Sequence, residues 1–287
     1  MPAPLLTDLL IYALLAGVIG FAVYASRHEH LRAPWREVRR SPVGMASAVV
    51  LAAYVLIGLL DSVHLHPRVT GEDGERRTSG EIVSVLDLAL SHLRTRSEKT
   101  YSAPFAWRLY VKETVEGEDG HQQRIYPRLE WGGAHLENPA RQRTTDVLVA
   151  SGQAFAAGLA LWAVLAAALV LVQGRGSAGF GARLRAIVRR ETDTPWAVIL
   201  LTALLVLLAC AWLWRLSLDW HVLGTDKVGQ DVLFQAIKSI RTGLVIGTLT
   251  TLVMLPFAIA LGMMAGYFGG RADDVIQYLY TTLNSIP

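Results

Sequence analysis

The stretch WAVILLTALLVLLACAWLW (196–214) decides the fold class of this chain. It is apolar around its whole circumference, whereas a surface helix of a globular protein keeps one polar face. The hydrocarbon core of a bilayer takes about 20 such residues as a helix. The stretch therefore predicts a transmembrane span. Four further runs have the same character, namely 5–24, 43–60, 147–172 and 243–267.

Composition points the same way. Of 287 residues, 52% are hydrophobic and 18% are charged, whereas a soluble domain has about a quarter of charged residues. We expect an all-α integral membrane protein with five complete spans, the start of a sixth, and a small α+β insert outside the membrane. The single cysteine, Cys210, lies in an apolar run, which excludes a disulfide framework and predicts a small, unreactive hydrophobic side chain.

Arginine placement predicts the orientation. The links 25–42 and 173–195 each hold five arginines, and positively charged short loops stay in the cytoplasm. The N-terminus and the segments 61–146 and 215–242 then face the other side. The first run has no preceding Lys or Arg, so it is not predicted to be a signal peptide.

Segment 61–146 differs in composition from the runs on either side. It mixes acidic and basic residues, and VTGEDGERRTSGE and VEGEDGHQQ are typical of turns. Between them, EIVSVLDLALSHL has apolar residues at helical spacing and FAWRLYVKETVE alternates like a strand. At about 85 residues the segment is long enough for a modest core of its own. We therefore expect an extracytoplasmic inserted domain between spans 1–60 and spans 147–214.

Few motifs indicate chemistry. GRGSAG (174–179) matches GxGxxG, but the run before it is a span and not the strand that a dinucleotide site requires, so we expect a basic loop. No GxxxxGK[ST] motif occurs, and no catalytic residues or nucleic-acid partner are predicted. His64 and His66 have a spacing compatible with a shared metal, yet no third ligand accompanies them, so solvated side chains are the ordinary expectation. Asp8 and Asp61 are expected at span boundaries, where a charge reaches the interface.

The stretch HVLGTDKVGQDVLFQAIKSIRTG (221–243) separates two apolar runs. Gly224 and Thr225 predict a turn, and Thr225 or Asp226 is a candidate cap of a helix that ends near Arg241. Val232, Leu233, Ala236, Ile237 and Ile240 share one face of this helix, and Asp231, Lys238 and Arg241 share the other. An amphipathic helix of this kind lies in the interface plane. From the residues alone, its expected task is to position the following span.

A family resemblance adds to this reading. Segment 223–287, with LGTDKVGQDV, GYFGG and SIP in order, resembles the start of the core permease domain of ABC importers for dipeptides, oligopeptides and nickel. Residues 34–60 resemble the basic lead and first span of the C-type subunit. Gln230 stands where the family usually has Arg, Arg271 where an aromatic residue is common, and SIP replaces SFP. The spans 147–172 and 196–214 and the insert are additions to the ordinary subunit.

The resemblance implies a permease subunit that imports peptides by alternating access across a bacterial inner membrane. Its expected partners are a second permease subunit, separate subunits that bind the ATP, and an extracytoplasmic solute-binding protein; the chain itself is not expected to be an enzyme or to hold a cofactor. The coupling loop of the family would lie beyond Pro287, so a truncated chain or a remainder on another chain is expected. The alternative is a membrane-anchored sensor or assembly protein that acts through segment 61–146.

The resemblance also suggests two groups of site residues. The first is an outer-face element near the entrance of the pathway, comprising Gly224, Thr225, Asp226, Gly229, Asp231 and Arg241. The second is a tight cytoplasmic turn, comprising Gly266, Gly269, Gly270 and Asp273, in which glycine permits a positive φ. Direct contact with substrate is not implied for either group.

Overall fold

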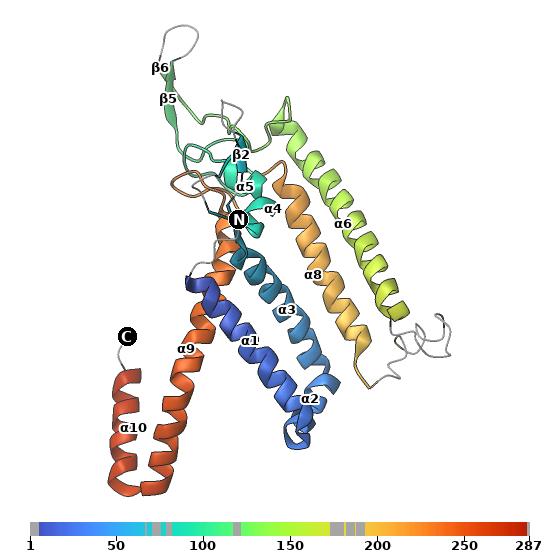
Figure 1. Ribbon diagram of the computed structural model, residues 1–287. Helices are drawn as coiled ribbons and strands as arrows, with labels where there is room; N and C mark the ends of the chain where they lie inside the picture. Colours follow the sequence, from blue (N-terminus) through green and yellow to red (C-terminus); the bar gives the residue numbers. More distant parts are fainter. Residues whose placement is uncertain are drawn as a thin grey trace. The chain divides into compact units, whose positions relative to one another are not determined.

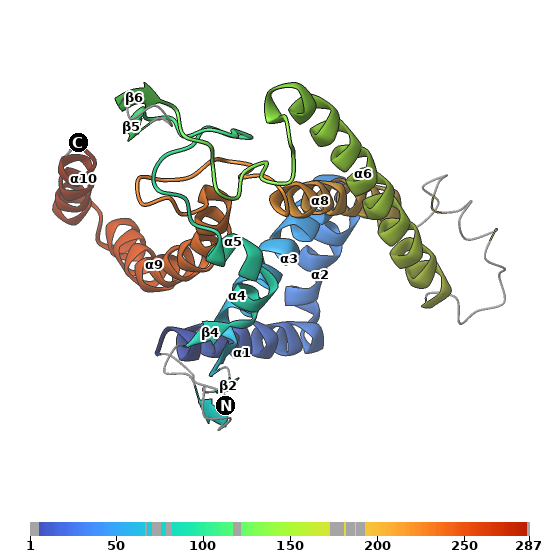
Figure 2. The same cartoon turned by 90° about the horizontal axis from the view of Figure 1, so that it is seen from above.

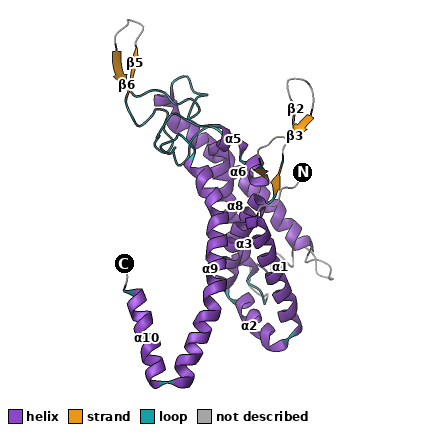
Figure 3. Cartoon of the chain, turned by 60° about the vertical axis from the view of Figure 1, so that its left-hand side comes forward, coloured by secondary structure: helices purple, strands orange, loops and turns teal. Residues whose placement is uncertain are grey.

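The computed structural model describes residues 6–66, 68–70, 76–78, 82–116, 122–172, 181, 187 and 193–285. The chain divides into two compact units, Met1–Arg241 and Thr242–Pro287, and each is treated by itself below. Figure 1 shows the elements in chain order, and Figure 3 shows that helices dominate while strands are confined to the segment between α3 and α6.

The predicted spans are confirmed as long apolar helices. They are α1 (Leu6–Arg27), α3 (Pro42–Ser62), α6 (Pro139–Val172), α8 (Trp196–Ser217) and α9 (Val232–Phe268). Among the described residues, these five helices are long and apolar enough to cross a membrane. The chain is thus a multi-pass membrane protein of the all-α class.

In the first unit α8 lies between α3 and α6 (Figures 1 and 2) and packs against both. Gly158 lets α6 approach α8 closely, because a Cβ there would lie 3.1 Å from the side chain of Leu208. Small residues at such crossings are typical of membrane helix pairs. Two indole N–H groups add hydrogen bonds across the pair, from Trp162 to the carbonyl of Leu200 (2.8 Å) and from Trp212 to Ser151 Oγ (2.9 Å).

The ends of the two basic links meet. The first link folds as the amphipathic helix α2 (Glu29–Arg40), and Ser41 then caps α3 by accepting a hydrogen bond from the N–H of Gly44 at 3.2 Å. Arg40 contacts Asp193 Oδ1, just before α8, at 3.2 Å. The described ends of the two links, at Arg40 and Asp193, therefore lie at the same end of this unit, as the predicted orientation requires. Most of the second link, including GRGSAG (174–179), lies outside the described residues.

The insert is α+β, with three separate two-stranded antiparallel pairs. The pairs are β1 (His64–Leu65) with β4 (Val83–Ser84), β2 (Arg68–Thr70) with β3 (Arg76–Thr78), and β5 (Glu113–Glu116) with β6 (Gln122–Ile125). The run predicted at helical spacing forms β4 and then two short helices, α4 (Val85–Ala89) and α5 (Ser91–Thr95). A capping box between Ser84 and Asp87 fixes the helix start, which explains why the helix does not begin earlier.

The insert shares its core with its neighbours. Leu86 of α4, Leu93 of α5 and Leu90 between them share this core. They pack with residues of α6, α8, the following loop and α9, namely Ala150, Leu216, Val222 and Leu233. This shared core holds the segment between α8 and α9 against the insert.

The start of α9 differs from the prediction. We expected a separate interfacial helix that ends near Arg241, whereas α9 runs without a break from Val232 to Phe268. No proline separates the amphipathic segment that ends near Arg241 from the apolar run that begins at 243, so the two segments form one continuous helix. In the second unit α9 ends at Phe268, and Gly269 (φ 57°) connects it to α10 (Gly270–Asn284).

Candidate functional site

The sequence-predicted outer-face residues lie in a tight loop, residues 221–231, called here the docked turn. The carboxylate of Asp226 closes it, because Oδ1 accepts the N–H groups of Val228 and Gln230, each at 2.9 Å. The N–H of Asp226 in turn donates to the carbonyl of Gln230 at 2.9 Å. The Gln235 amide donates to Asp226 Oδ2 at 2.8 Å, and this bond, followed by those from the N–H groups of Gln230 and Val228, holds the pKa of Asp226 below its ordinary value. The loop is thus ordered by its own sequence.

The cap of α9 is Asp231, which corrects the prediction of Thr225 or Asp226. Asp231 Oδ1 accepts the N–H groups of Leu233 (2.8 Å) and Phe234 (3.2 Å). An N-cap carboxylate bonds the N–H groups two and three residues ahead in this way. Because residues 226–230 close on themselves, helical geometry can begin only after the turn.

The docked turn pairs with residues 98–105 of the insert through its backbone. The N–H of Glu98 donates to the carbonyl of Gly229 (2.8 Å), and the N–H of Thr225 donates to the carbonyl of Ser102 (3.3 Å). The Thr225 hydroxyl donates to the carbonyl of Thr100 at 2.8 Å. The insert therefore satisfies polar groups of the turn that would otherwise need water.

Glycine is required where the two segments touch. Gly224 and Gly229 have φ of 77° and 78°, in the left-handed region where a side chain is strained. A Cβ at Gly224 would lie 2.3 Å from the carbonyl oxygen of Ser102, and one at Gly229 would lie 1.7 Å from that of Glu98. Both positions thus exclude every other residue, on conformational and on steric grounds.

A buried ion cluster joins the turn, the insert and α9. His221 Nδ1 lies 2.7 Å from Asp231 Oδ2, and His221 Nε2 lies 3.3 Å from Glu98 Oε1. All three side chains are at most 4% exposed. Burial by itself lowers the pKa of His221, but the hydrogen bonds to Asp231 and Glu98 outweigh it and raise the pKa to about 9. The histidine is therefore a buried cation held between two carboxylates.

Glu98 is held in place from its own side. Its carboxylate accepts the backbone N–H groups of Glu130 (2.9 Å), Trp131 (2.8 Å) and Gly132 (3.3 Å). Burial works to raise the pKa of Glu98, yet His221 and the three N–H groups hold it below the ordinary value. Successive backbone N–H groups favour the ionised form of a carboxylate. The pair stays charged near neutral pH, and no proton transfer is needed to keep the turn docked.

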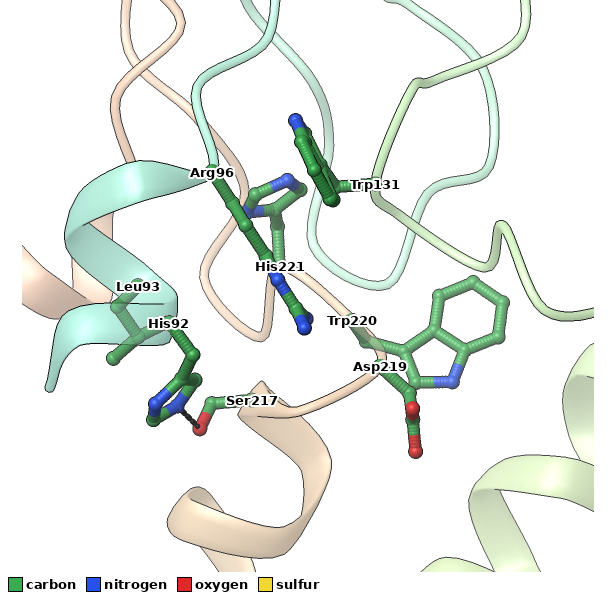
Figure 4. A pocket seen from close by; sticks show the side chains of 8 residues that line it. All are labelled: His92, Leu93, Arg96, Trp131, Ser217, Asp219, Trp220 and His221. Carbon is green, nitrogen blue, oxygen red and sulfur yellow. Dashed lines mark hydrogen bonds between the residues drawn. The ribbon is translucent and has the colours of Figure 1, made fainter. Parts of the chain in front are cut away.

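A shallow pocket borders this cluster (Figure 4), lined by His92, Leu93, Arg96, Trp131, Ser217, Asp219, Trp220 and His221. Arg96 donates to the carbonyl of Leu218 and lies over the Trp131 ring, 5.5 Å from its centroid. Trp220 is buried, and its indole N–H donates to Asp146 at 2.9 Å. Two pairs of lining side chains are engaged with each other, Arg96 with Trp131 and His92 with Ser217 (2.9 Å), which suits a support for the turn more than a reaction site.

A second cluster binds the first turns of α9. Lys238 Nζ lies 2.7 Å from Asp87 Oδ1 and 3.2 Å from Asp61 Oδ1. The Ser84 hydroxyl also donates to Asp61, at 2.8 Å. Burial works to raise the pKa of Asp87, but the bonds from Lys238 and Ser84 bring it below its usual value. Arg241 contacts Asp8, one carboxylate oxygen of which lies 2.8 Å from His64 Nδ1.

This cluster corrects three expectations. Asp8 and Asp61 do lie at helix ends, but they are 0% and 2% exposed and do not reach solvent. His64 was expected to be solvated, whereas it is buried against Asp8. Buried charges require partners, and the polar face of α9 supplies them. In the described part of the chain, no group of three His, Cys, Asp or Glu residues is placed to hold a metal ion.

The expected cytoplasmic turn lies in the other unit. Gly269 and Gly270, with φ of 57° and 49°, connect α9 to α10. Gly266 lies inside α9, and Asp273 lies in the first turn of α10, 3.4 Å from the amide nitrogen of Gln277. The predicted residues therefore lie in three places: the docked turn, the second ion cluster, which contains Arg241, and the turn between α9 and α10. Glu98, the residue that sequence reasoning missed, has no local signal, because its partner lies 123 positions away.

Comparison with characterised proteins gives the same resemblance. The chain is 28% identical over 125 residues to the oligopeptide transport system permease protein OppC of Mycobacterium tuberculosis, which covers 38% of this chain and 43% of that protein. It is 34% identical over 67 residues to the dipeptide transport system permease protein DppC of Haemophilus influenzae, and 42% identical over 57 residues to OppC of Lactococcus lactis. The match to DppC covers 23% of this chain and 23% of DppC. The match to OppC of Lactococcus lactis covers 20% of this chain and 19% of that protein.

The chain thus spans less than half the length of these curated relatives. No family model matches it, and no solved structure does. The chain is similar to the permease subunits of ABC peptide transport systems, in keeping with the resemblance that the sequence motifs suggest.

Proposed function

We propose that this chain is a permease subunit of an ATP-driven peptide importer. The similarity to OppC and DppC carries the proposal. Five apolar helices provide the membrane-spanning part that such a subunit requires. Its partners are then a second permease subunit, ATP-binding subunits and an extracytoplasmic solute-binding protein, and hydrolysis takes place outside this chain.

The docked turn is the element that we assign to the outer entrance of the pathway. Segment 215–242 follows a span whose other end carries the basic link, so the positive-inside rule puts the turn outside. The docked turn is fixed at the start of α9 by its own hydrogen bonds, by the insert and by the two ion clusters. In alternating access a ligand acts only by favouring one state over another. A fixed turn gives a delivering protein a constant surface while other parts of the importer change conformation.

Uptake tests this proposal. The chromosomal gene is changed to carry Gly229→Val, and uptake of radiolabelled dipeptides and oligopeptides is measured in intact cells. Because a side chain at this position collides with the Glu98 backbone, we expect uptake to fall at least tenfold while the protein still reaches the membrane, as checked by immunoblot.

Gly152→Val is the matched control. A Cβ there meets nothing within 4 Å, so we expect uptake to stay within twofold of the wild type. Full peptide uptake in Gly229→Val cells that hold normal amounts of the protein would contradict the proposal, and so would full uptake after deletion of the gene. A sensor that acts through the insert predicts this second result.

A further inference from the structure

The helix α2 is held at the membrane surface by its two neighbours. One residue separates its start from the span α1, which ends at Arg27, and one residue separates its end at Arg40 from the span α3. Connectors this short keep α2 at the ends of the two spans, where Figures 1 and 3 show it. The positive-inside rule puts this end of the unit on the cytoplasmic side. The helix therefore lies where lipid meets water.

One face of α2 is apolar. Leu31, Trp35 and Val38 are spaced i, i+4 and i+7, which places them on the same side of a helix. No residue of α2 is buried, and Trp35 and Val38 are 56% and 43% exposed. Tryptophan is enriched at the level of the lipid headgroups, where its ring contacts acyl chains and its N–H contacts water. The rest of the unit thus leaves this stripe open to lipid.

A second stripe on α2 is basic. Arg32, Arg36 and Arg39 each follow one member of the apolar stripe in sequence, so they lie about 100° round the helix from it. All three are exposed. Arg36 contacts Glu29 at 3.3 Å. Within the described residues, Arg32 and Arg39 form no ion pair with a carboxylate, so their charges are available to a ligand.

The charge of this region stays positive when its carboxylates are included. Residues 27–40 hold five arginines and two glutamates. The nearby Asp193 pairs with Arg40 and not with the basic stripe. Arginine binds phosphate oxygens through two parallel N–H groups, and the cytoplasmic leaflet is the negatively charged one. The two stripes therefore match the two parts of an anionic phospholipid.

Lipid also fits the geometry better than a soluble protein partner does. A soluble partner approaches from the water and would have to displace lipid from the exposed apolar stripe. Amphipathic helices with basic residues beside an apolar face lie in the interface plane with that face among the acyl chains. Since both ends of α2 are joined to spans, it is already at this depth and needs no further partner.

We propose that α2 is a binding site for anionic phospholipids of the cytoplasmic leaflet. Trp35 and Val38 contact the acyl chains, and Arg32 and Arg39 bind the headgroup phosphates. The outer ends of α1 and α3 are fixed to α9 through the buried Asp8 and the second ion cluster. Bound lipid fixes the opposite ends of the same two spans.

Native mass spectrometry of the full chain in detergent, which counts bound lipids, tests the site. The probes are dioleoyl phosphatidylglycerol, which is anionic, and dioleoyl phosphatidylcholine, which has the same acyl chains and no net charge. One basic residue near an anionic surface accounts for about fivefold in affinity, so we expect the wild type to prefer phosphatidylglycerol at least fivefold. In the double variant Arg32→Glu, Arg39→Glu, binding of phosphatidylglycerol should weaken at least tenfold and that of phosphatidylcholine should not.

Two further variants control for charge and for folding. Lys112→Glu, Arg124→Glu makes the same charge change at exposed residues of the insert and should leave the affinity within twofold of the wild type. The pair Arg32→Lys, Arg39→Lys keeps the charge and should lose less than threefold. Equal affinity of the wild type for the two lipids, undiminished binding by the glutamate variant, or an equal loss in the lysine and glutamate variants would each overturn the proposal.

The position of Trp35 is tested separately in proteoliposomes that contain phosphatidylglycerol. Emission of the wild type minus that of Trp35→Phe isolates this side chain among the eight tryptophans. We expect lipid brominated near the headgroup end of the acyl chain to quench the difference emission. An absence of quenching would overturn the proposal. Loss of copurifying protein subunits from Arg32→Glu, Arg39→Glu would then assign α2 to a protein interface.

Discussion

The docked turn and the turn between α9 and α10 both contain positive-φ glycines, and they use them for different reasons. In the docked turn, a Cβ at Gly229 would lie 1.7 Å from a backbone oxygen of the insert. At Gly269, between α9 and α10, a Cβ would meet nothing within 4 Å. The first glycine is required by packing and by backbone conformation, the second by conformation alone. The same residue type in a similar motif therefore has a different energetic weight in each unit.

The largest expected effect is at the packed turn. Gly229→Ala must displace the Glu98 backbone and adopt a strained φ, so we expect a loss of about 4 kcal/mol or more in stability. Thermal unfolding of the purified protein in detergent, followed by tryptophan fluorescence, measures it. Gly152→Ala, in open space on α6, should change stability by less than about 1 kcal/mol. Equal melting temperatures for the two variants would show that the turn is not docked on the insert.

The two aspartates of the docked turn are expected to differ in how much stability is lost when each is replaced by asparagine. Asp231→Asn keeps the capping oxygen but removes a buried charge from His221, which should cost about 3 kcal/mol. Asp226→Asn keeps its acceptor in a more exposed site and should cost less than about 1 kcal/mol. Denaturant unfolding of both variants side by side gives the difference. A larger loss for Asp226→Asn would contradict the assignment of Asp231 to the buried cluster.

The buried histidine gives the docked turn a pH dependence that the second turn lacks. The folded pKa of His221, about 9, lies above its ordinary value, so its stabilisation is fully present below about pH 6.5 and is lost as the pH rises through 9. We expect the melting temperature to fall across this alkaline range. Glu98, with a lowered pKa, adds a loss only at acidic pH. In His221→Gln the alkaline fall should be much smaller, and an unchanged fall would assign it to other groups.

A smaller effect than at Gly229 is expected at Gly269, in the turn between α9 and α10. Gly269 has φ 57° and ψ −167°, a region that is essentially restricted to glycine. Gly269→Ala should therefore cost about 2 kcal/mol locally, without a steric collision. Hydrogen exchange of residues 266–272, read by mass spectrometry, should increase, whereas that of residues 221–231 should not. An increase in both segments would mean that the two turns are energetically coupled.

The parts of the fold that follow from composition could be predicted, and those that depend on distant partners could not. Each apolar run must become a helix in lipid because its backbone has no other partner there, so five spans are readable from residues alone. The cap at Asp231 was misassigned, because the choice between Thr225, Asp226 and Asp231 depends on how the turn closes. Glu98 gave no usable signal, since a carboxylate in a mixed-charge sequence looks solvated until its cation is placed. Asp8 and Asp61 were predicted as boundary residues, but their cationic partners were not.

The shared core of the insert has a consequence for biogenesis. Leu86, Leu90 and Leu93 are synthesised long before Leu216, Val222 and Leu233, with which they pack. Contacts so far apart in sequence form late and slowly. While the next two spans are being synthesised, the apolar side chains of α4 and α5 are exposed, and Glu98 has no ion pair because His221 has not yet been made. A nascent chain halted before residue 233 should therefore be degraded by proteases or retained by chaperones, even though the first four spans are already in the membrane.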